Sequence, residues 1–451
     1  MRSLPITALV AAVLVPTTGT AQRGDPDAYA FVGANVLPMD TPRILADQTV
    51  VIRDGRIVEV SPRGRASLPP GARVIDARGK YLIPGLAEMH AHVPTDQQPD
   101  LLERVLTLFA VNGVTTIRGM LGHPSHIRLR EELAAGTRLG PRLVTSGPSF
   151  NANTARTWEA AVAMVSAQKE AGYDFLKIHP GVPRPAFDSL AATAHRLGIR
   201  FAGHVPLEVG LERALEARYA TIDHIDGFLE ALLPPNAPVK PTQPNFGIGL
   251  VEYLDESRIP SVAGAVAAAG VAVVPTQGFL VGQYGPLPAE SLAARPEMRY
   301  WPEQQVEQWA TAKRAADRQY PATVRARFLE LRRRAIAALH SAGATILLGS
   351  DAPQLWDVPG FSIHRELHYY VEAGLTPFEA LASGTSNVAR FFGWEDSGTI
   401  APGKRADLVL LDGNPLQNID NTRGIAGVML GGRWLDRDRI AELLRTLERS
   451  D

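Results

Sequence analysis

Eight short apolar runs recur through the middle of the chain at steps that fit alternating strands and helices. They are the segments 82–92, 114–120, 142–147, 173–179, 199–205, 219–225, 271–277 and 345–351. Segments with helical periodicity lie between them, including 157–172 and 187–198. Most steps are about 20–30 residues, which is typical of βα units with right-handed crossovers. The spacing therefore predicts an α/β protein built on a (β/α)₈ barrel, or TIM barrel.

Both ends of the chain are rich in short β-type runs instead. Residues 29–83 alternate such runs with turns, and Asp54-Gly55 is a hairpin signal. We expect one small β-sandwich domain made from residues 22–83 and 396–451, and a barrel over residues 84–395. Two connections, 228–270 and 278–344, are too long for simple βα units. We expect them to be long loops at the barrel mouth, the second with an amphipathic helical region around 302–342.

The N-terminal 21 residues look like a secretory signal, with Arg2, a short apolar stretch and small residues ending at Ala21. The apolar stretch is shorter than the roughly 20 residues that cross a bilayer, so no membrane anchor is expected. A disordered or packed tail is the alternative. This pattern predicts a bacterial protein exported to the periplasm or secreted, with a mature chain starting near Gln22.

The composition narrows the partners and ligands. The 451-residue chain has a formal net charge of −1, which argues against a nucleic-acid partner. It has no cysteine, so any metal must be held by nitrogen and oxygen atoms. The one cluster of like charges, Arg332–Arg334, lies in a charge-rich helical segment and is expected to form a solvated face. A small-molecule substrate is expected, and a homo-oligomeric assembly stays open.

Candidate metal ligands stand at or just past the ends of these strand-like runs. His90 and His92 are two residues apart, so on a strand their side chains point to the same face. His204 and His224 each end a later strand, and Asp351 ends the last one. The C-terminal strand ends of a barrel converge on one mouth, where active sites are built. Taken singly, each histidine could instead be a hydrogen-bonded core residue, and Asp351 could be an N-cap for the Ala-Pro turn that follows it.

Lys177 is the residue that favours a site for two metal ions over a site for one. The alternation in DFLKIHP puts Phe175, Lys177 and His179 on one face of a strand buried on both sides. Burying an unpaired ammonium costs free energy, so a lysine at this position requires an explanation. One explanation is a neutral amine that takes up carbon dioxide as a carbamate and bridges two metals. A lysine that extends to the barrel rim is the alternative.

Together these residues predict a site for two divalent ions, and zinc is the metal that we expect. His90, His92 and Asp351 would hold one ion and His204 and His224 the other, with carboxylated Lys177 and a hydroxide between them. Asp351 could accept a proton from the attacking water, which makes it the general-base candidate. Asp223 or Asp226 could orient His224, but the sequence leaves that choice open.

At this point the chain resembles the amidohydrolase superfamily, most closely its imidazolonepropionase-like and prolidase-like branch. The resemblance lies in LIPGLAEMHAH, KIHPG, AGHVP, GSDAP and the tail GTIAPGKRADLVLLDGNPL, and covers nearly the whole mature chain. It implies a binuclear zinc barrel with a carboxylated lysine and a terminal β-sandwich.

The leading functional prediction is hydrolysis of an amide bond in a dipeptide or N-acyl amino acid. Cyclic amides, lactones or esters on the same site are the first alternative. A one-metal heterocycle deaminase and a non-catalytic binding protein are the others. Deaminases of this type usually lack the strand-four lysine and carry glutamate where this chain has Leu207. Three residues are candidates for substrate contacts: Arg118 for a carboxylate, with a structural salt bridge as its alternative, His179 and Tyr284.

Overall fold

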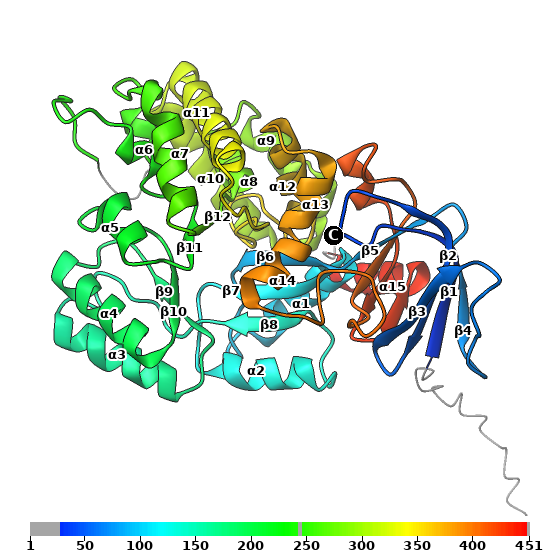
Figure 1. The fold of residues 1–451 in the computed structure, drawn as a ribbon. Helices are drawn as coiled ribbons and strands as arrows, with labels where there is room; N and C mark the ends of the chain where they lie inside the picture. Colours follow the sequence, from blue (N-terminus) through cyan, green and yellow to red (C-terminus); the bar gives the residue numbers. More distant parts are fainter. Residues whose placement is uncertain (1–27, 242–245, 449–451) are drawn as a thin grey trace, which may run out of the picture.

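The computed structural model describes residues 28–241 and 246–448, so the expected signal segment lies outside the described residues. Within these ranges a helix-rich α/β domain adjoins a sheet domain (Figure 1). Its arrangement is that of a TIM-barrel-like domain beside a sheet. No helix in the described part of the chain is long and apolar enough to cross a membrane.

The sheet domain combines strands from both ends of the chain. Its strands are β1 (Ala28–Val36), β2 (Leu45–Arg53), β3 (Arg56–Pro62), β4 (Arg73–Asp76), β5 (Tyr81–Pro84), β13 (Leu408–Leu411), β14 (Ile425–Leu430) and β15 (Arg433–Asp436). Hydrogen bonds join them in the order β15-β14-β13-β5-β1-β2-β3, with β4 also paired to β1. They form one sheet with its own apolar core around Phe31, Leu408 and Trp434. A division into two sandwich layers stays a prediction.

The strands of the α/β domain follow the predicted order. They are β6 (Leu86–Ala91), β7 (Val114–Gly119), β8 (Arg142–Thr145), β9 (Phe175–Ile178), β10 (Arg200–Gly203), β11 (Thr221–Asp223) and β12 (Ala272–Val274). All pair in parallel, as β6-β7-β8 and as β12-β11-β10-β9. Isolated bridges between Ser146 and Phe175 and between Phe150 and Ile178 connect the two groups.

The predicted eighth strand, 345–351, differs from the expectation because it is not a regular strand. Ile346 makes an isolated bridge to Val273 of β12, and the Met89 amide of β6 donates to the Leu348 carbonyl. The segment therefore fills the gap between β12 and β6, with two backbone hydrogen bonds to Val273 on one side and one from Met89 on the other.

The predicted strand 82–92 also differs, because it is two strands separated at Gly85. Strand β5 pairs with β13 in the sheet domain, whereas β6 pairs with β7 in the α/β domain. A Cβ atom at Gly85 would lie 2.1 Å from Thr115 Oγ1, so only glycine allows the chain to pass this close to β7.

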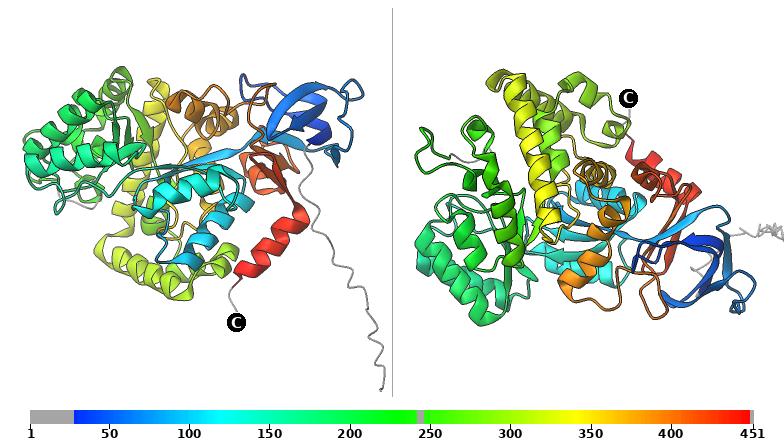
Figure 2. Two further views of the ribbon diagram at one scale, coloured as in Figure 1. Left: turned by 90° about the horizontal axis from the view of Figure 1, so that it is seen from below. Right: turned by 45° about the horizontal axis from the view of Figure 1, so that its top comes forward.

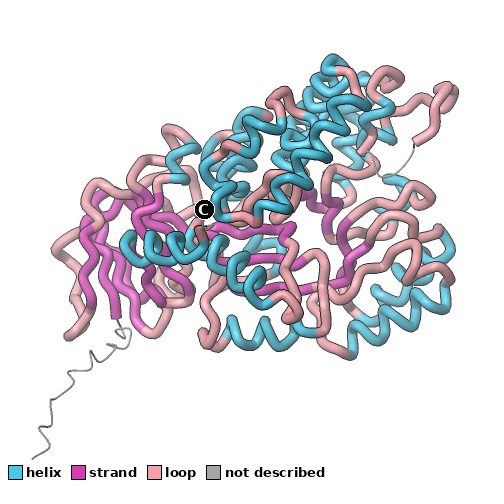
Figure 3. The backbone as a smooth tube through the Cα atoms, turned by 180° about the vertical axis from the view of Figure 1, so that it is seen from behind, coloured by secondary structure: helices cyan, strands magenta, loops and turns pink. Residues whose placement is uncertain are grey.

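The helices occupy the connections and cover the strands (Figures 2 and 3). They are α1 (Pro99–Val111), α2 (Ser125–Ala134), α3 (Trp158–Glu170), α4 (Arg184–Leu197), α5 (Gly210–Glu216), α6 (Phe228–Ala231), α7 (Ile259–Ala268), α8 (Gln277–Tyr284), α9 (Ala289–Ala293), α10 (Glu303–Gln319), α11 (Ala322–Ser341), α12 (Phe361–Glu372), α13 (Pro377–Ser383), α14 (Ser386–Phe392) and α15 (Arg437–Leu447). The second long connection, 278–344, is thus largely helical, whereas the described part of the first, 228–270, is helical mainly at α6 and α7. The expected helical region 302–342 is present as α10 and α11, separated at Pro321 because proline disfavours a helical residue before it.

Candidate metal centre

The six candidate ligands meet at the C-terminal ends of the parallel strands. His90 lies on β6 and Lys177 on β9, while His204 and His224 directly follow β10 and β11. The rings of His90 and His204 each lie with their centroids 4.5 Å from that of His224. Asp351 Oδ2 lies 3.8 Å from His224 Nδ1. The structure therefore brings together residues from strands far apart in the sequence.

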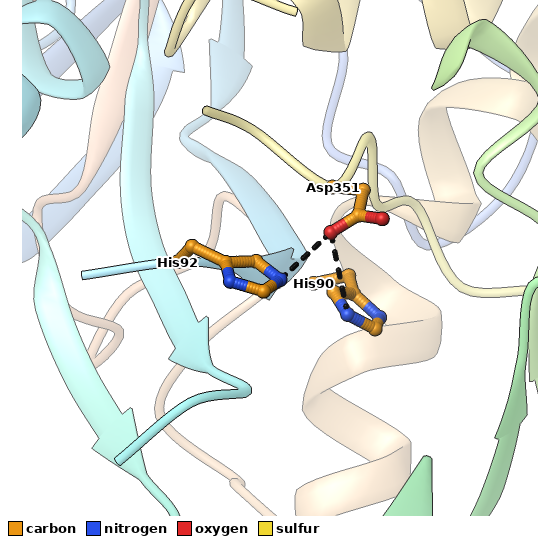
Figure 4. Close-up of side chains that lie close together, drawn as sticks. All are labelled: His90, His92 and Asp351. Carbon is orange, nitrogen blue, oxygen red and sulfur yellow. Dashed lines mark ion pairs between the residues drawn. The ribbon is translucent and has the colours of Figure 1, made fainter. Parts of the chain in front are cut away.

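His90, His92 and Asp351 form the tightest group (Figure 4). Asp351 Oδ1 lies 2.8 Å from His92 Nε2 and 3.5 Å from His90 Nε2. One potential ligand atom from each residue lies within 4.8 Å of the others. Two imidazoles and a carboxylate in this arrangement are donors suited to a divalent ion such as zinc.

Lys177 lies directly against this group and is fully buried. Its Nζ is 3.3 Å from His90 Nε2. Burial lowers the pKa of Lys177 to about 8, although the charges of Asp223 and Asp351 act in the opposite direction. A Cβ atom at Gly203 would lie 2.8 Å from Lys177 Cδ, so the glycine before His204 leaves room for the lysine chain. The side chain thus lies buried beside the histidines, and the rim-lysine alternative does not describe it.

Three of the histidines have a polar partner at the ring nitrogen Nδ1. Asp226 Oδ2 lies 2.7 Å from His204 Nδ1, and Asp223 Oδ2 lies 3.0 Å from His90 Nδ1 without hydrogen-bond alignment. The Thr276 hydroxyl donates to the Pro275 carbonyl and so accepts from His224 Nδ1, 2.8 Å away. Such partners fix the ring orientation and leave Nε2 for a metal. The two aspartates beside His224 thus serve other histidines.

The backbone at this centre is also unusual. His224, Thr276 and Asp351 have φ values of 60°, 48° and 71°, in the left-handed region that non-glycine residues rarely adopt. Each costs of order 1–3 kcal/mol, and such residues cluster at functional sites. The buried imidazoles, the carboxylate and their polar partners together fit divalent ions held by nitrogen and oxygen.

Two further residues position the candidate ligands, and neither was predicted from the sequence. The buried Glu88 carboxylate accepts hydrogen bonds from the amides of His90 and Ser350 at 2.8 and 2.9 Å, and so joins β6 to the segment that carries Asp351. Gln354 Nε2 lies 3.1 Å from His92 Nε2 and 3.2 Å from Asp351 Oδ1. Glu88 lies in the HAH segment GLAEMHAH, but nothing in that pattern indicates which main-chain amides it meets.

The three candidate substrate residues have different surroundings. The His179 ring stacks on His204 with centroids 5.2 Å apart, which puts it at the site. Arg118 is buried, and its guanidinium donates to Asp223, Thr221 and the Met89 carbonyl, which corresponds to the salt-bridge alternative. The Tyr284 ring packs edge-on against Tyr320 and Phe328.

Arg332 corrects the expectation of a solvated arginine face. Its side chain is buried and donates to the carbonyls of His224 and Pro275 at 2.7 and 2.8 Å, and to Gln277 Oε1 at 3.0 Å. Its neighbour Arg333 pairs with Glu330 at a partly exposed position. Helix α11 thus uses one arginine of the triplet to hold the backbone on which His224 is carried.

Solved structures share this fold over nearly the whole chain. A bottromycin amidohydrolase has a TM-score of 0.72 and 24% identity, with 94% of this chain and 91% of that chain covered. A Xaa-Pro dipeptidase with bound methionine has a TM-score of 0.66 and 19% identity, with 91% and 100% covered. At these identities the similarity demonstrates a common fold.

Sequence comparison gives shorter matches and one family. An adenine deaminase from Chelativorans sp. (strain BNC1) is 30% identical over 207 residues, which are 41% of this chain and 32% of the deaminase. The chain spans less than a third of the length of each of three curated adenine deaminases that it matches. The model of the amidohydrolase family matches residues 81–435, which include all six candidate ligands. The chain belongs to the amidohydrolase family.

Proposed function

We propose that this protein is a metal-dependent hydrolase that cleaves the amide C–N bond of a dipeptide or N-acyl amino acid, using two divalent ions, most plainly zinc. The observation that carries the proposal is the convergence of His90, His92, His204, His224, Asp351 and buried Lys177 at one set of strand ends. The family match and the fold shared with a Xaa-Pro dipeptidase and an amidohydrolase support it.

In this proposal the residues have different roles. His90, His92 and Asp351 would hold one ion and His204 and His224 the other. Bound divalent ions lower the pKa of water and polarise a scissile carbonyl. Asp351 accepts the proton of the attacking water, and Gln354 holds its carboxylate in place. His179, beside His204, orients the substrate.

Lys177 would act as a ligand after carboxylation. Its neutral amine forms an N–C bond to carbon dioxide and releases one proton, which gives a carbamate with two oxygen donors. Burial of the side chain and its 3.3 Å contact with His90 Nε2 support this, because an ammonium there would face a metal-binding nitrogen.

The wider expectations remain proposals as well. We propose export to the periplasm or the medium after removal of residues 1–21, and a sandwich over 22–83 and 396–451 beside a barrel over 84–395. Homo-oligomer formation stays open.

A substrate screen tests the proposed reaction. Zinc-loaded protein is assayed against dipeptides, N-acyl amino acids, cyclic amides and lactones, with kcat/KM for each and ammonia release followed in parallel. We expect the highest kcat/KM on a linear amide, and a loss of at least about 100-fold in Asp351→Asn, the size of a general-base contribution. Asp357→Asn, a second buried aspartate, is the matched control and should keep its activity. A screen without amide cleavage contradicts the proposal.

Deamination of a heterocycle is the second candidate, favoured by the adenine deaminase match. Lys177 argues against it, and so does the residue pattern after His204: Leu207 occupies the glutamate position, and Glu208 is exposed. Ammonia release from purines or pyrimidines without amide cleavage would establish deamination instead.

A further inference from the structure

A cavity lies at the opposite end of the parallel strands from the candidate metal centre. It has a volume of about 530 Å³ and is lined by the first residues of β8, β9 and β10, which are Arg142, Phe175 and Arg200, and by Trp394. None of the six candidate metal ligands lines it. The strand interior of a TIM barrel is normally filled by side chains, and this volume falls in the range of small-molecule pockets.

The cavity lining combines an apolar surface with four arginines and two carboxylates, those of Glu131 and Asp174. Ala202 pairs with Lys177 and Arg200 with Phe175 in parallel register, so one face of β9 and β10 leads from the cavity toward the metal centre. Phe175 and Ala202 belong to one apolar cluster, which Trp394 adjoins. The apolar wall provides a surface for a planar hydrocarbon group.

Three of the four lining arginines already have partners. Arg118 pairs with Asp223, Arg130 pairs with Asp174, and Arg200 donates to the Phe391 carbonyl. Arg142 has none: within residues 28–241 and 246–448 no carboxylate lies at ion-pair distance from it, and its guanidinium lies 3.6 Å from the Trp394 ring centroid. A partly buried guanidinium that is stacked but without an anion is a ready partner for a carboxylate.

We propose that this cavity is a second binding site, which takes a small aromatic carboxylate. The carboxylate pairs with Arg142, and the ring packs on Phe175 and Ala202. A neutral ligand would leave the Arg142 charge without a partner. Arg118 lines the cavity and also donates to Asp223, whose carboxylate lies beside His90 Nδ1. Arg118 therefore connects the cavity to the carboxylate behind a candidate metal ligand.

Isothermal titration calorimetry on the zinc-loaded full chain tests this site with 2-naphthoate and its neutral analogue 2-naphthylmethanol. We expect the carboxylate to bind at least about tenfold more tightly, because one charge-assisted contact of 1.4 kcal/mol corresponds to a factor of ten. Arg142→Met should weaken 2-naphthoate by a similar factor. Arg128→Met, on the exposed face of α2, should leave its affinity unchanged.

A second variant keeps the test decisive if Arg142→Met does not fold. Ala220→Phe fills the cavity and keeps Arg142, so it should abolish binding while its thermal unfolding stays close to that of the parent. Equal affinity for the alcohol and the carboxylate, or no binding at millimolar ligand, would overturn the proposal. Binding that survives both cavity variants but is lost in Asp351→Asn would assign the ligand to the metal centre and overturn it as well.

Discussion

Replacement of Asp223 by asparagine is the perturbation that most sharply separates folding from metal binding. The Asp223 carboxylate lies between the Arg118 guanidinium, at 3.1 Å, and His90 Nδ1, at 3.0 Å. All three side chains are buried. Asparagine keeps the size of the side chain but removes its charge, so Arg118 becomes a buried cation without a counter-ion, and the imidazole of His90 loses a carboxylate.

The magnitudes follow from this burial. Breaking a buried ion pair by removing one partner costs about 3–5 kcal/mol. An unfolding entropy of about 2.1 cal/mol/K per residue gives roughly 1 kcal/mol per degree for a chain of this length, so Tm should fall by about 3–5 °C. Loss of a carboxylate behind a ligating histidine weakens metal binding by about 10–100-fold.

Two assays and a double variant distinguish these effects. Thermal unfolding of metal-free protein measures the first effect, and zinc competition against a chromogenic chelator measures the second. In Arg118→Met/Asp223→Asn the orphaned cation is gone, so we expect much of the stability to return while zinc affinity stays low. A single variant that loses less than about 1 kcal/mol and binds zinc as the parent does would refute this reasoning.

Three other substitutions test separate parts of the structure. Arg332→Met should lower the free energy of unfolding by about 2–4 kcal/mol, because two buried carbonyls lose their donor. The control Arg333→Met should change it by less than about 1 kcal/mol, because its ion pair is partly exposed. Equal losses of the two variants in urea unfolding would contradict this. Thr276→Val should weaken zinc binding about tenfold or more in the same chelator competition, because His224 Nδ1 loses its acceptor, and unchanged affinity would contradict it. Burial lowers the pKa of His364 to about 3 from 6.5, so its contribution to stability is present above pH 6.5 and is lost as the pH falls toward 3. His364→Gln should therefore reduce the pH slope of unfolding free energy of the metal-free protein in this range by about 1.4 kcal/mol per pH unit, and an unchanged slope would contradict it.

The sequence predicted what depends on local pattern. Short apolar runs and their spacing indicated the order of the parallel strands, and the HxH pair, Lys177 and Asp351 were found because strand ends in a barrel share one mouth. His179 followed from the same alternation as Lys177. These inferences need only the period of a strand and the direction of the chain.

The remainder depends on distances between segments that no local pattern encodes. The partners of His90 and His204 are Asp223 and Asp226. Asp226 follows β11 and reaches the adjacent β10, whereas Asp223 of β11 reaches β6, with which β11 does not pair. In the sequence Arg332 is one of three adjacent arginines, but only its position on α11 faces the buried carbonyls of His224 and Pro275. The interruption at Gly85 is a consequence of close passage by Thr115, which is a tertiary contact.

Metal content is the most direct test of the proposed two-metal centre. The protein is purified from zinc-supplemented culture with bicarbonate, and zinc per chain is counted by mass spectrometry for the parent, Lys177→Met and the control Lys313→Met. Lys313 is also fully buried but pairs with Asp317, on the same helix. We expect two zinc ions per chain in the parent and in the control, and one or none in Lys177→Met. One ion in the parent, or two in Lys177→Met, would contradict it.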